Sequence, residues 1–393
     1  MHIAVVGPVN VASLAPLLSG EDRRLALAQP SDNGSAPGRI VTALHERGHE
    51  VSVVTHRRGL EPLVLNGDRL SVHRVASRSN RAAQIGSRWA SERSAMAEKI
   101  VQLSPDVTHS QWTYEAALAC LDSGLPHVAT VRDAPLTVIR FDPRPTRVVR
   151  ASMAYEFRLR SRNSLLTAPS PYMARMWRRQ MLDARQVAVV PNPVPNILHG
   201  PFERKSDFPL LVEVADEGRR KNVRGLLAAF VLVRAQLPTA QLVLIGDGLD
   251  ISGETQRWAA AQGLASGVQF LGKVPSDEVH QWLARAWLHV HAAFEESFGN
   301  TLVEAFACGT AVLGGHRSAA VPWVLADGEA GVLANVASPQ DLASAIVRVV
   351  QDRELLRRLG MAGRLRAENE FSPSSVAAKY ESVYRSALEQ KRS

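Results

Sequence analysis

The sequence predicts an α/β protein built from two doubly wound domains, each with a parallel sheet covered by helices on both faces. Three observations support this prediction. Stretches typical of buried strands alternate with stretches typical of helices along the whole chain. Three prolines at 191–195 interrupt that alternation near the middle of the chain. The length of 393 residues is that of two domains rather than one.

The first domain is expected over residues 1–190. It opens with a strand-like run at 3–6 that ends in Gly7, and a helix is expected at 38–46, with Pro37 suited to its first turn. Short runs rich in β-branched residues predict the other strands, at 50–55, 107–109, 127–131, 164–168 and 187–190. In a sheet of this class, ligands bind at the carboxyl ends of the strands.

The second domain is expected over residues 210–372. A linker at 191–209 precedes it, because its prolines are incompatible with a helix interior or a central strand. Strands are expected at 210–214, 241–245, 268–270, 288–291 and 311–313, and helices at 223–235, 277–284 and 301–307. The last stretch, 373–388, has the pattern of an amphipathic helix.

Composition and charge limit the class of protein. Hydrophobic residues make up 46% of the chain and charged residues 21%, which excludes a disordered chain or a coiled-coil rod. Two cysteines, Cys120 and Cys308, cannot form a disulfide framework and favour a reducing compartment. No apolar run approaches the roughly 18 residues of a membrane span, and residues 1–7 lack the layout of a signal peptide. These features predict a cytoplasmic protein.

The positive charge is concentrated in the first half. Residues 1–200 hold 25 Lys and Arg against 16 Asp and Glu, whereas residues 201–393 hold 21 against 22. Two arginine-rich stretches, 74–93 and 140–162, carry much of the excess, with Trp89, Tyr155 and Phe157 among them. They suit a solvated helix face, the inner surface of a membrane or a phosphorylated acceptor. No nucleic-acid-binding module accompanies the charge, so no nucleic-acid partner is expected.

The most specific motif is the run 295–305, Glu-Glu-Ser-Phe-Gly-Asn-Thr-Leu-Val-Glu-Ala. Two carboxylates, Glu296 and Glu304, flank a turn that leads into a helix. Backbone N–H groups at the start of a helix bind anions, and a glycine there lets a phosphate approach the backbone closely. The carboxylates can accept hydrogen bonds from sugar hydroxyls. Alone, the run is also compatible with a capped helix that carries two surface glutamates.

Four further motifs surround this run, at 219–222 (Arg-Arg-Lys-Asn), 245–248 (Ile-Gly-Asp-Gly), 309–312 (Gly-Thr-Ala-Val) and 324–331. In this order and spacing, the second half resembles the family-four retaining glycosyltransferases, which have the GT-B fold. The resemblance covers about 185–390 well. It covers the first half more loosely, through the opening strand, 47–51 and 190–192. It implies two Rossmann-like domains facing a cleft, with a C-terminal helix over 373–393 that packs back on the first domain.

The resemblance assigns roles in the second domain. Glu296 is expected to hold the donor sugar, Glu304 the ribose and Lys221 a phosphate. The backbone amides of the turn are expected to meet the diphosphate, at Phe298, Gly299, Asn300, Thr301 and Leu302. Gly246 and Val274 are expected to line the donor site, the latter through backbone contact with the nucleobase. No Asp-x-Asp motif is present, so neither a metal nor a cofactor is expected.

The chain departs from the family pattern at several positions. The arginine that relatives carry shortly before the lysine is Ala215 here, so Arg219 or Arg220 is expected to replace it. The Gly-Gly-x-x-Glu of many relatives ends in Pro322. In the first domain, the histidine that many relatives place after the strand 128–131 is Arg132, which is followed by Asp133.

Four residues of the first domain are candidates near the donor or acceptor. Asp133 is expected to bind a sugar hydroxyl, whereas Arg132 stays protonated and cannot act as a base. A structural Arg–Asp pair is the alternative. His109 is a weaker candidate, with a buried structural histidine as its alternative. Gly34 is the best equivalent of a family glycine loop, within a long loop at 8–37.

The predicted function is retaining transfer of a sugar from a UDP- or GDP-linked donor to a hydroxyl acceptor. The predicted catalytic residues are Glu296, Lys221, Arg220, Asp133 and Arg132. The basic first domain favours an anionic or membrane-associated acceptor, and the sequence does not indicate an oligomeric state. A catalytically degenerate binding protein and a nucleotide-sugar epimerase remain as alternatives. A nicotinamide-dependent oxidoreductase is disfavoured, because 7–10 do not match Gly-x-Gly-x-x-Gly.

Overall fold

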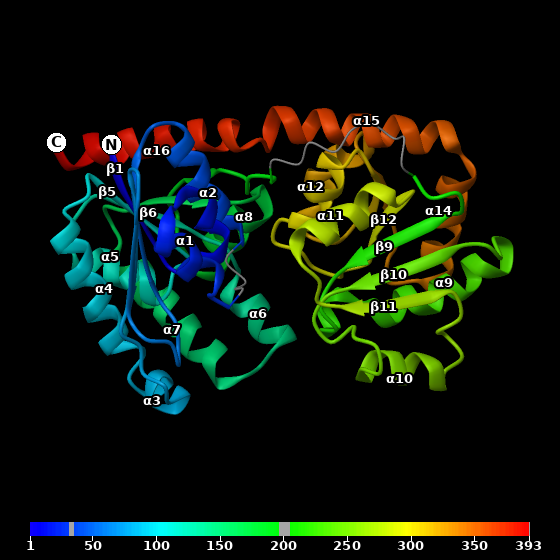
Figure 1. Cartoon of the computed structure of the whole chain (residues 1–393), viewed down its shortest axis with the longest axis horizontal. Helices are drawn as coiled ribbons and strands as arrows, with labels where there is room; N and C mark the ends of the chain where they lie inside the picture. Colours follow the sequence, from blue (N-terminus) through cyan, green and yellow to red (C-terminus); the bar gives the residue numbers. More distant parts are fainter. Residues whose placement is uncertain (31–34, 196–204, 393) are drawn as a thin grey trace. The chain divides into compact units, whose positions relative to one another are not determined.

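The computed structural model describes residues 1–30, 35–195 and 205–392. The chain forms two compact units, one of Met1–Pro193 with Pro373–Ser393 and the other of Val194–Ser372 (Figure 1). The boundary therefore lies within the proline-rich segment 191–195. Each unit contains one sheet with helices on both faces.

The first unit has an eight-stranded sheet in the order β3-β4-β2-β1-β5-β6-β7-β8. All its neighbours pair in parallel except β3 and β4. Its strands are β1 His2–Val6, β2 Glu50–His56, β3 Leu63–Gly67, β4 Leu70–Val75, β5 Val107–Gln111, β6 His127–Thr130, β7 Leu165–Ala168 and β8 Val187–Val189. Its helices are α1 Gly20–Leu27, α2 Ser35–Glu46, α3 Arg81–Gly86, α4 Ala90–Leu103, α5 Glu115–Asp122, α6 Pro135–Phe141, α7 Pro145–Arg160, α8 Pro171–Gln180 and α16 Pro373–Arg392, with a 3-10 helix at Val11–Leu17.

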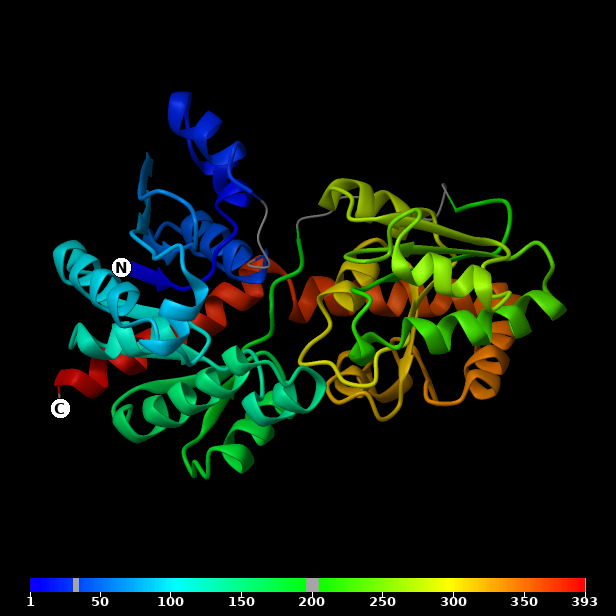
Figure 2. The same cartoon turned by 90° about the horizontal axis from the view of Figure 1, so that it is seen from below.

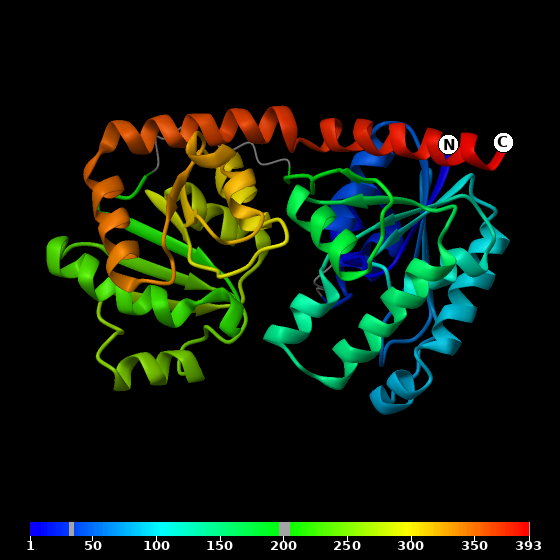
Figure 3. The ribbon, with the colours of Figure 1, turned by 180° about the vertical axis from the view of Figure 1, so that it is seen from behind.

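Alternate residues of the central strands enter two cores. In β1, Ile3 and Val5 pack with α2 and α16, whereas Ala4 and Val6 pack with α4 and α5. Burial on both faces explains why these strands are continuous apolar runs. The last helix, α16, thus belongs to the core of the first unit, where Tyr380 is fully buried (Figure 3). Helices α6 and α7, which follow β6 along the chain, pack side by side (Figure 2).

The second unit has a six-stranded, all-parallel sheet in the order β11-β10-β9-β12-β13-β14. Its strands are β9 Leu210–Val214, β10 Gln241–Ile245, β11 Val268–Gly272, β12 Leu288–His291, β13 Ala311–Gly315 and β14 Val332–Ala334. Its helices are α9 Val223–Gln236, α10 Glu254–Ala261, α11 Ser276–Arg285, α12 Asn300–Ala307, α13 Val321–Val324, α14 Pro339–Gln351 and α15 Arg353–Glu370, with 3-10 turns at Arg219–Lys221 and Ala326–Gly328.

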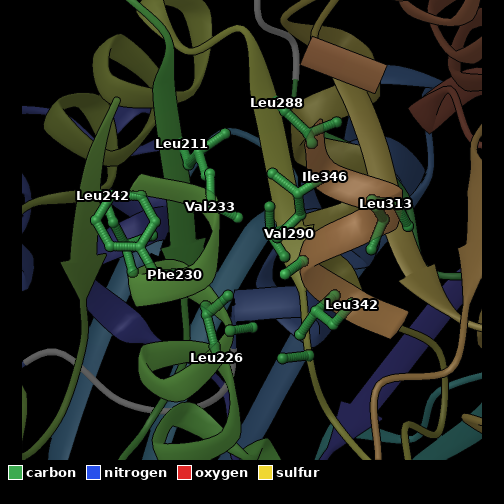
Figure 4. Close-up of a cluster of buried hydrophobic side chains, with 14 of the residues drawn as sticks. Leu211, Leu226, Phe230, Val233, Leu242, Leu288, Val290, Leu313, Leu342 and Ile346 are labelled. Atoms are coloured by element: carbon green, nitrogen blue, oxygen red, sulfur yellow. The ribbon is translucent and has the colours of Figure 1, made fainter. Parts of the chain in front are cut away.

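The core of the second unit also divides between the two faces of its sheet. Leu211 and Val290 pack against α9 and α14, in the cluster that Figure 4 shows, with Phe230 and Ile346 supplied by the helices. Residues of the opposite parity, such as Val212, pack against α11 and α12. In both units the direction of the crossovers changes beside the first strand, β1 or β9, and a crevice opens at that point in sheets of this class.

Two parts of the first unit differ from the sequence prediction. The long loop expected over 8–37 contains a 3-10 helix at Val11–Leu17 and the helix α1, and α2 begins already at Ser35. The antiparallel β3–β4 hairpin extends the sheet at one edge, where no strands were expected. No helix within the described parts of the chain is long and apolar enough to cross a membrane.

Candidate active site

The first cluster of polar residues lies at the crevice of the second sheet. The basic turn 219–222 follows β9, and the loop 292–299 follows β12, the strand paired with β9. Hydrogen bonds join the two segments: the Phe294 N–H donates to the Arg220 carbonyl at 2.9 Å, and Arg220 donates to the Glu295 carbonyl at 2.9 Å. The topology of the sheet therefore brings the predicted phosphate-binding cations to the predicted sugar-binding carboxylate.

Glu296 is the centre of this cluster. Its Oε2 atom accepts a hydrogen bond from Lys221 Nζ at 2.6 Å and lies 3.5 Å from Arg220. Burial alone would raise the pKa of the Glu296 carboxyl, but Lys221, His291 and Arg220 hold it well below its usual range. The Ala320 N–H donates to the Glu296 carbonyl at 3.1 Å and anchors the backbone. Glu296 is thus a fixed, ionised acceptor for hydroxyl groups.

Two residues beneath Glu296 were not identified from the sequence. His291 ends β12 and is fully buried, with Nε2 at 3.5 Å from Glu296 and Nδ1 at 3.5 Å from Glu213. Glu213 is also fully buried, on β9, and accepts a hydrogen bond from the Ala292 N–H at 3.2 Å. Burial lowers the pKa of His291, but the two carboxylates raise it by more, so the net shift is upward. Both residues lie within strand-like runs, and nothing in the sequence indicated that their polar side chains would be buried there.

The helix α12 begins directly after this loop. Gly299 precedes it with a φ of 91°, a left-handed conformation, and a Cβ atom there would lie 2.6 Å from Leu302 Cδ1. Glycine is therefore required at this turn. Asn300 and Thr301 occupy the first turn of α12, and buried Glu304 lies one turn further along. The start of the helix supplies positive partial charge for an anion.

One residue of the turn has its ring in the core, and another has its amide already paired. The Phe298 ring is buried against Trp323 and Phe371. The Leu302 N–H donates to the Gly299 carbonyl at 3.1 Å, and its side chain is in the core. The free amides that the resemblance implies are therefore not those of Leu302, which corrects that expectation.

The remaining donor-site candidates lie at neighbouring strand ends. Gly246 follows β10 with a φ of 136°, and a Cβ atom would lie 1.9 Å from the carbonyl oxygen of Ala215. Val274 is half-buried after β11. Arg219 is exposed and has no ion-pair partner among the described residues, whereas Arg220 contacts the cluster. Of the two arginines expected to replace the family arginine at Ala215, Arg220 is the one beside Glu296.

A second polar site lies at the crevice of the first sheet. Residues after β1, β2, β5 and β6 surround a cavity of about 440 Å³, which we call the sheet-edge cavity. Its lining includes Gln111, Trp112, Tyr114, Glu115 and Asp133. The sequence identified only Asp133 among these residues.

Two carboxylates of the sheet-edge cavity have different electrostatic environments. Asp133 accepts a hydrogen bond from the Tyr114 hydroxyl at 2.5 Å, yet burial dominates and raises its pKa. Glu115 pairs with Arg150 at 2.7 Å and lies 3.8 Å from His56. Burial raises the pKa of Glu115, but these neighbours lower it by more, to about 2. Asp133 is therefore the carboxylate more able to take up a proton.

Two candidates of the first unit, Arg132 and His109, are buried and have hydrogen-bond partners within that unit. Arg132 is buried and donates to Gln111 at 2.7 Å and to Asn192 at 2.6 Å, outside the lining of the sheet-edge cavity. His109 is fully buried within β5, and its ring nitrogens contact the Tyr384 and Thr130 hydroxyls, each at 2.7 Å. The structural alternative is therefore the one that these contacts favour for His109, and the role of Arg132 stays a prediction. Gly34 lies outside the described residues.

Comparison with known families agrees with this geometry. The model of the Glycosyltransferase Family 4 domain matches residues 38–196, and the model of the glycosyl transferases group 1 matches residues 197–366. The chain belongs to glycosyltransferase family 4. The two matches meet between 196 and 197, close to the boundary of the two units.

Individual relatives and solved structures extend this result. The family 4 protein is 24% identical over 364 residues to N-acetyl-alpha-D-glucosaminyl L-malate synthase of Bacillus anthracis, with 88% of this chain and 91% of that protein covered. It is 32% identical over 227 residues to a phosphatidyl-myo-inositol mannosyltransferase of Mycolicibacterium smegmatis, covering 54% and 55% of the two chains. Sucrose-phosphate synthase from Thermosynechococcus elongatus has the same fold, with a TM-score of 0.73, 18% identity, and 99% and 100% coverage. The fold is GT-B.

Proposed function

We propose that this protein is a retaining glycosyltransferase that moves a sugar from a UDP- or GDP-linked donor to a hydroxyl acceptor. One observation carries the proposal: Lys221 Nζ lies 2.6 Å from Glu296, beside Arg220 and next to the loop that begins α12. Glu296 accepts hydrogen bonds from the hydroxyls of the donor sugar. The cations and the first amides of α12 bind the diphosphate, and Glu304 binds the ribose.

The chemistry needs stabilisation of charge on the leaving group. As the glycosidic bond breaks, negative charge develops on the nucleoside diphosphate, and fixed cations and dipoles stabilise it most when they are already in place. Arg220 and Lys221 are both held in position by the loop 294–296. Arg supplies a planar fork of donors and Lys a compact charge. We propose that these groups neutralise the diphosphate without a metal ion.

The acceptor is proposed to bind in the sheet-edge cavity of the first unit. Asp133, with its raised pKa, accepts a hydrogen bond from an acceptor hydroxyl. Retention without an enzymatic nucleophile requires transfer on the face that the leaving group departs from. In that mechanism an oxygen of the departing diphosphate takes the proton of the acceptor hydroxyl, while the new bond forms at the anomeric carbon.

A thermal-shift panel tests the donor site. The nucleotides UDP, GDP, ADP and dTDP and their sugars are added to the wild type and to Glu304→Ala, because a ligand that binds only the folded state raises the melting temperature. We expect one nucleotide to stabilise the wild type and to lose that effect in the variant. Product analysis by NMR then reports the anomeric configuration, and added EDTA is expected to leave the rate unchanged. No shift with any nucleotide, or an inverted product, would overturn the proposal.

A catalytically degenerate binding protein is the second candidate. The observation in its favour is Ala215, which is buried beside Gly246 where relatives carry an arginine. Such a protein would be stabilised by a nucleotide sugar but would never release the free nucleotide. An epimerase would instead convert the nucleotide sugar with no acceptor present. Incubation of the donor with and without a panel of hydroxyl acceptors separates these outcomes.

A further inference from the structure

A second cavity of the first unit is lined by five arginines. This cavity of about 230 Å³, which we call the arginine pocket, contains Arg58, Arg81, Arg144, Arg147 and Arg150 in its lining. The lining includes no carboxylate, and its other residues are His56, Gln84, Trp89 and Thr146. The arginines come from three places in the chain: the segment after β2, the start of α3 and the start of α7.

Neighbouring carboxylates neutralise only part of this charge. Asp142 pairs with Arg144 and with Arg147, whose Nε lies at 3.0 Å, and Glu115 pairs with Arg150 at 2.7 Å. Glu92, behind Gln84, is paired with Arg78 at 3.2 Å. Arg58 and Arg81 are exposed, and neither side chain has a hydrogen bond or ion pair with another described residue. The pocket therefore has an excess of three positive charges.

The backbone adds to this positive potential. Helix α7 begins at Pro145, directly at the pocket, with no acidic residue in its first turn and no side-chain cap on its amides. Its N-terminus carries partial positive charge. Trp89 and Tyr114 flank the Arg150 guanidinium, at 5.3 Å and 5.5 Å from their ring centroids, and hold it in place. Arg150 is thus held in place before a ligand binds, whereas the exposed side chains of Arg58 and Arg81 have no such support.

The arginine pocket adjoins the proposed acceptor site. His56, Arg147 and Arg150 line both this pocket and the sheet-edge cavity, so the two spaces share one wall. A single molecule can place an anionic group among the arginines and a hydroxyl near Asp133. The sheet-edge cavity itself has two carboxylates and suits the neutral, hydroxylated part of such a molecule.

We propose that the arginine pocket binds a phosphate ester carried by the acceptor. This inference rests on the proposed function, because it takes the sheet-edge cavity as the acceptor site. A phosphate monoester is a dianion with three outer oxygens, and several guanidinium groups can each donate to it in pairs. An excess of three charges matches this group better than a carboxylate, which has one charge and two oxygens. The ester belongs either to a free phosphorylated polyol or to the headgroup of a lipid.

Calorimetric titration with inorganic phosphate at low ionic strength tests the pocket directly. The proteins are the wild type, Arg58→Gln with Arg81→Gln, and a control with the same change in charge, Arg175→Gln with Arg179→Gln. All four arginines are exposed, so each double variant is expected to fold, and circular dichroism checks this. The pocket variant is expected to bind phosphate about tenfold more weakly for each lost charged hydrogen bond, and the control on α8 to bind as the wild type does.

Three results would overturn the proposal. The wild type fails to bind phosphate, the pocket variant binds it as well as the wild type, or the control loses as much affinity as the pocket variant. The thermal shift with the donor nucleotide is measured on the same samples. If the nucleotide gives no thermal shift but phosphate still binds, only the proposed function is contradicted. If phosphate does not bind but the nucleotide still gives its thermal shift, only the phosphate site is contradicted.

Two further probes identify the source of the phosphate. Glycerol 3-phosphate, with glycerol as its control, represents a free ester, and phosphatidic acid in phosphatidylcholine vesicles represents a lipid that carries a phosphate monoester. If the wild type binds glycerol 3-phosphate but does not sediment with the vesicles, the acceptor is a free ester. If it sediments with the anionic vesicles and the pocket variant does not, the acceptor is a lipid. Either result supports the proposal, and binding to neither probe counts against it.

Discussion

The Nε2 atom of His291 lies 3.5 Å from a carboxylate oxygen of Glu296, and the imidazole is fully buried beneath that residue. On its other side, Nδ1 lies 3.5 Å from Glu213. Burial and Lys221 lower the pKa of His291, but the two carboxylates favour the charged imidazole and raise this pKa by more. The proposed sugar-binding carboxylate, Glu296, is therefore in contact with a titratable side chain.

The contact of His291 with the two carboxylates predicts that the stability of the protein depends on pH, and that Glu213→Gln will change this dependence. Because the folded-state pKa of His291 is raised, its contribution to stability is full below the unfolded value of 6.5 and is lost as pH rises through the folded value. Without Glu213, that loss is expected to begin at a lower pH. Melting temperature measured from about pH 6 to pH 9 checks this. Glu254→Gln, at an exposed position, is the control, and identical profiles for both variants would contradict the prediction.

Replacement of Lys221 by methionine is expected to affect both stability and catalysis. The Lys221 and Glu296 side chains are only 13% and 10% exposed, and removal of one partner from a buried pair costs about 3 kcal/mol. The transfer rate is expected to fall about 100-fold, because a preorganised charge on the leaving group is lost. Urea unfolding and steady-state kinetics measure the two effects. Lys379→Met, at an exposed position of α16, should leave the transfer rate unchanged and cost at most about 1 kcal/mol of stability, and an active Lys221→Met would rule out the proposed role.

Asp133→Asn is expected to separate acceptor chemistry from donor binding. The amide keeps the size of the side chain but is a weaker hydrogen-bond acceptor than the carboxylate, so the acceptor hydroxyl is held less well and transfer should fall by about 10- to 100-fold. The nucleotide-induced thermal shift depends on the second unit and should not change. Tyr114→Phe removes the hydrogen bond to Asp133 and is expected to have a smaller effect of the same kind. Equal transfer rates in the wild type and Asp133→Asn would remove Asp133 from the mechanism.

Gly299→Ala is expected to weaken donor binding through the backbone. An alanine at a φ of 91° is strained, and its Cβ atom would lie 2.6 Å from Leu302 and 3.3 Å from Glu296 Cγ. A cost of about 1–2 kcal/mol in unfolding free energy is expected. The turn must shift to relieve the contact, so the nucleotide-induced thermal shift should fall as well. A destabilised variant that binds nucleotide normally would show that the turn does not form the diphosphate site.

Tyr384→Phe tests the structural role of His109. The Tyr384 hydroxyl contacts His109 Nδ1 at 2.7 Å inside the first core, and loss of a buried hydrogen bond costs about 1–2 kcal/mol. The free energy of unfolding should fall by that amount, with no change in kcat or KM. A large loss of activity in a folded variant would return His109 to the list of residues near the substrate.

In the second unit, the sequence predicted every strand except β14, and the helices α9, α11 and α12, but not α10, α13, α14 or α15. The strands at 210–214, 241–245 and 288–291 have the predicted bounds, because short apolar runs end there at Gly or polar residues. In the first unit, the hairpin β3–β4 was missed, since an edge hairpin has a partly exposed pattern. Helices α6 and α7 were also missed, because prolines and arginines mask their apolar positions.

The candidate site was predictable only where a local motif carried it. Glu296, Lys221 and Gly299 lie in recognisable runs, and the paired strands β9 and β12 bring those runs together. Glu213 and His291 have no such motif, because only the pairing across 78 positions of the chain makes them neighbours. Glu115 and the arginine pocket depend in the same way on contacts between distant elements.

The position of α16 has a consequence for the synthesis of the chain. Tyr380 and Tyr384 complete the core around β1 and α2, yet the ribosome makes them after the whole of the second unit. Units of a chain generally fold as they emerge, in order of synthesis. The second unit can therefore fold while the first unit still exposes the apolar side chains that α16 will cover. The nascent first unit is therefore expected to need protection from aggregation until translation of 373–392 ends.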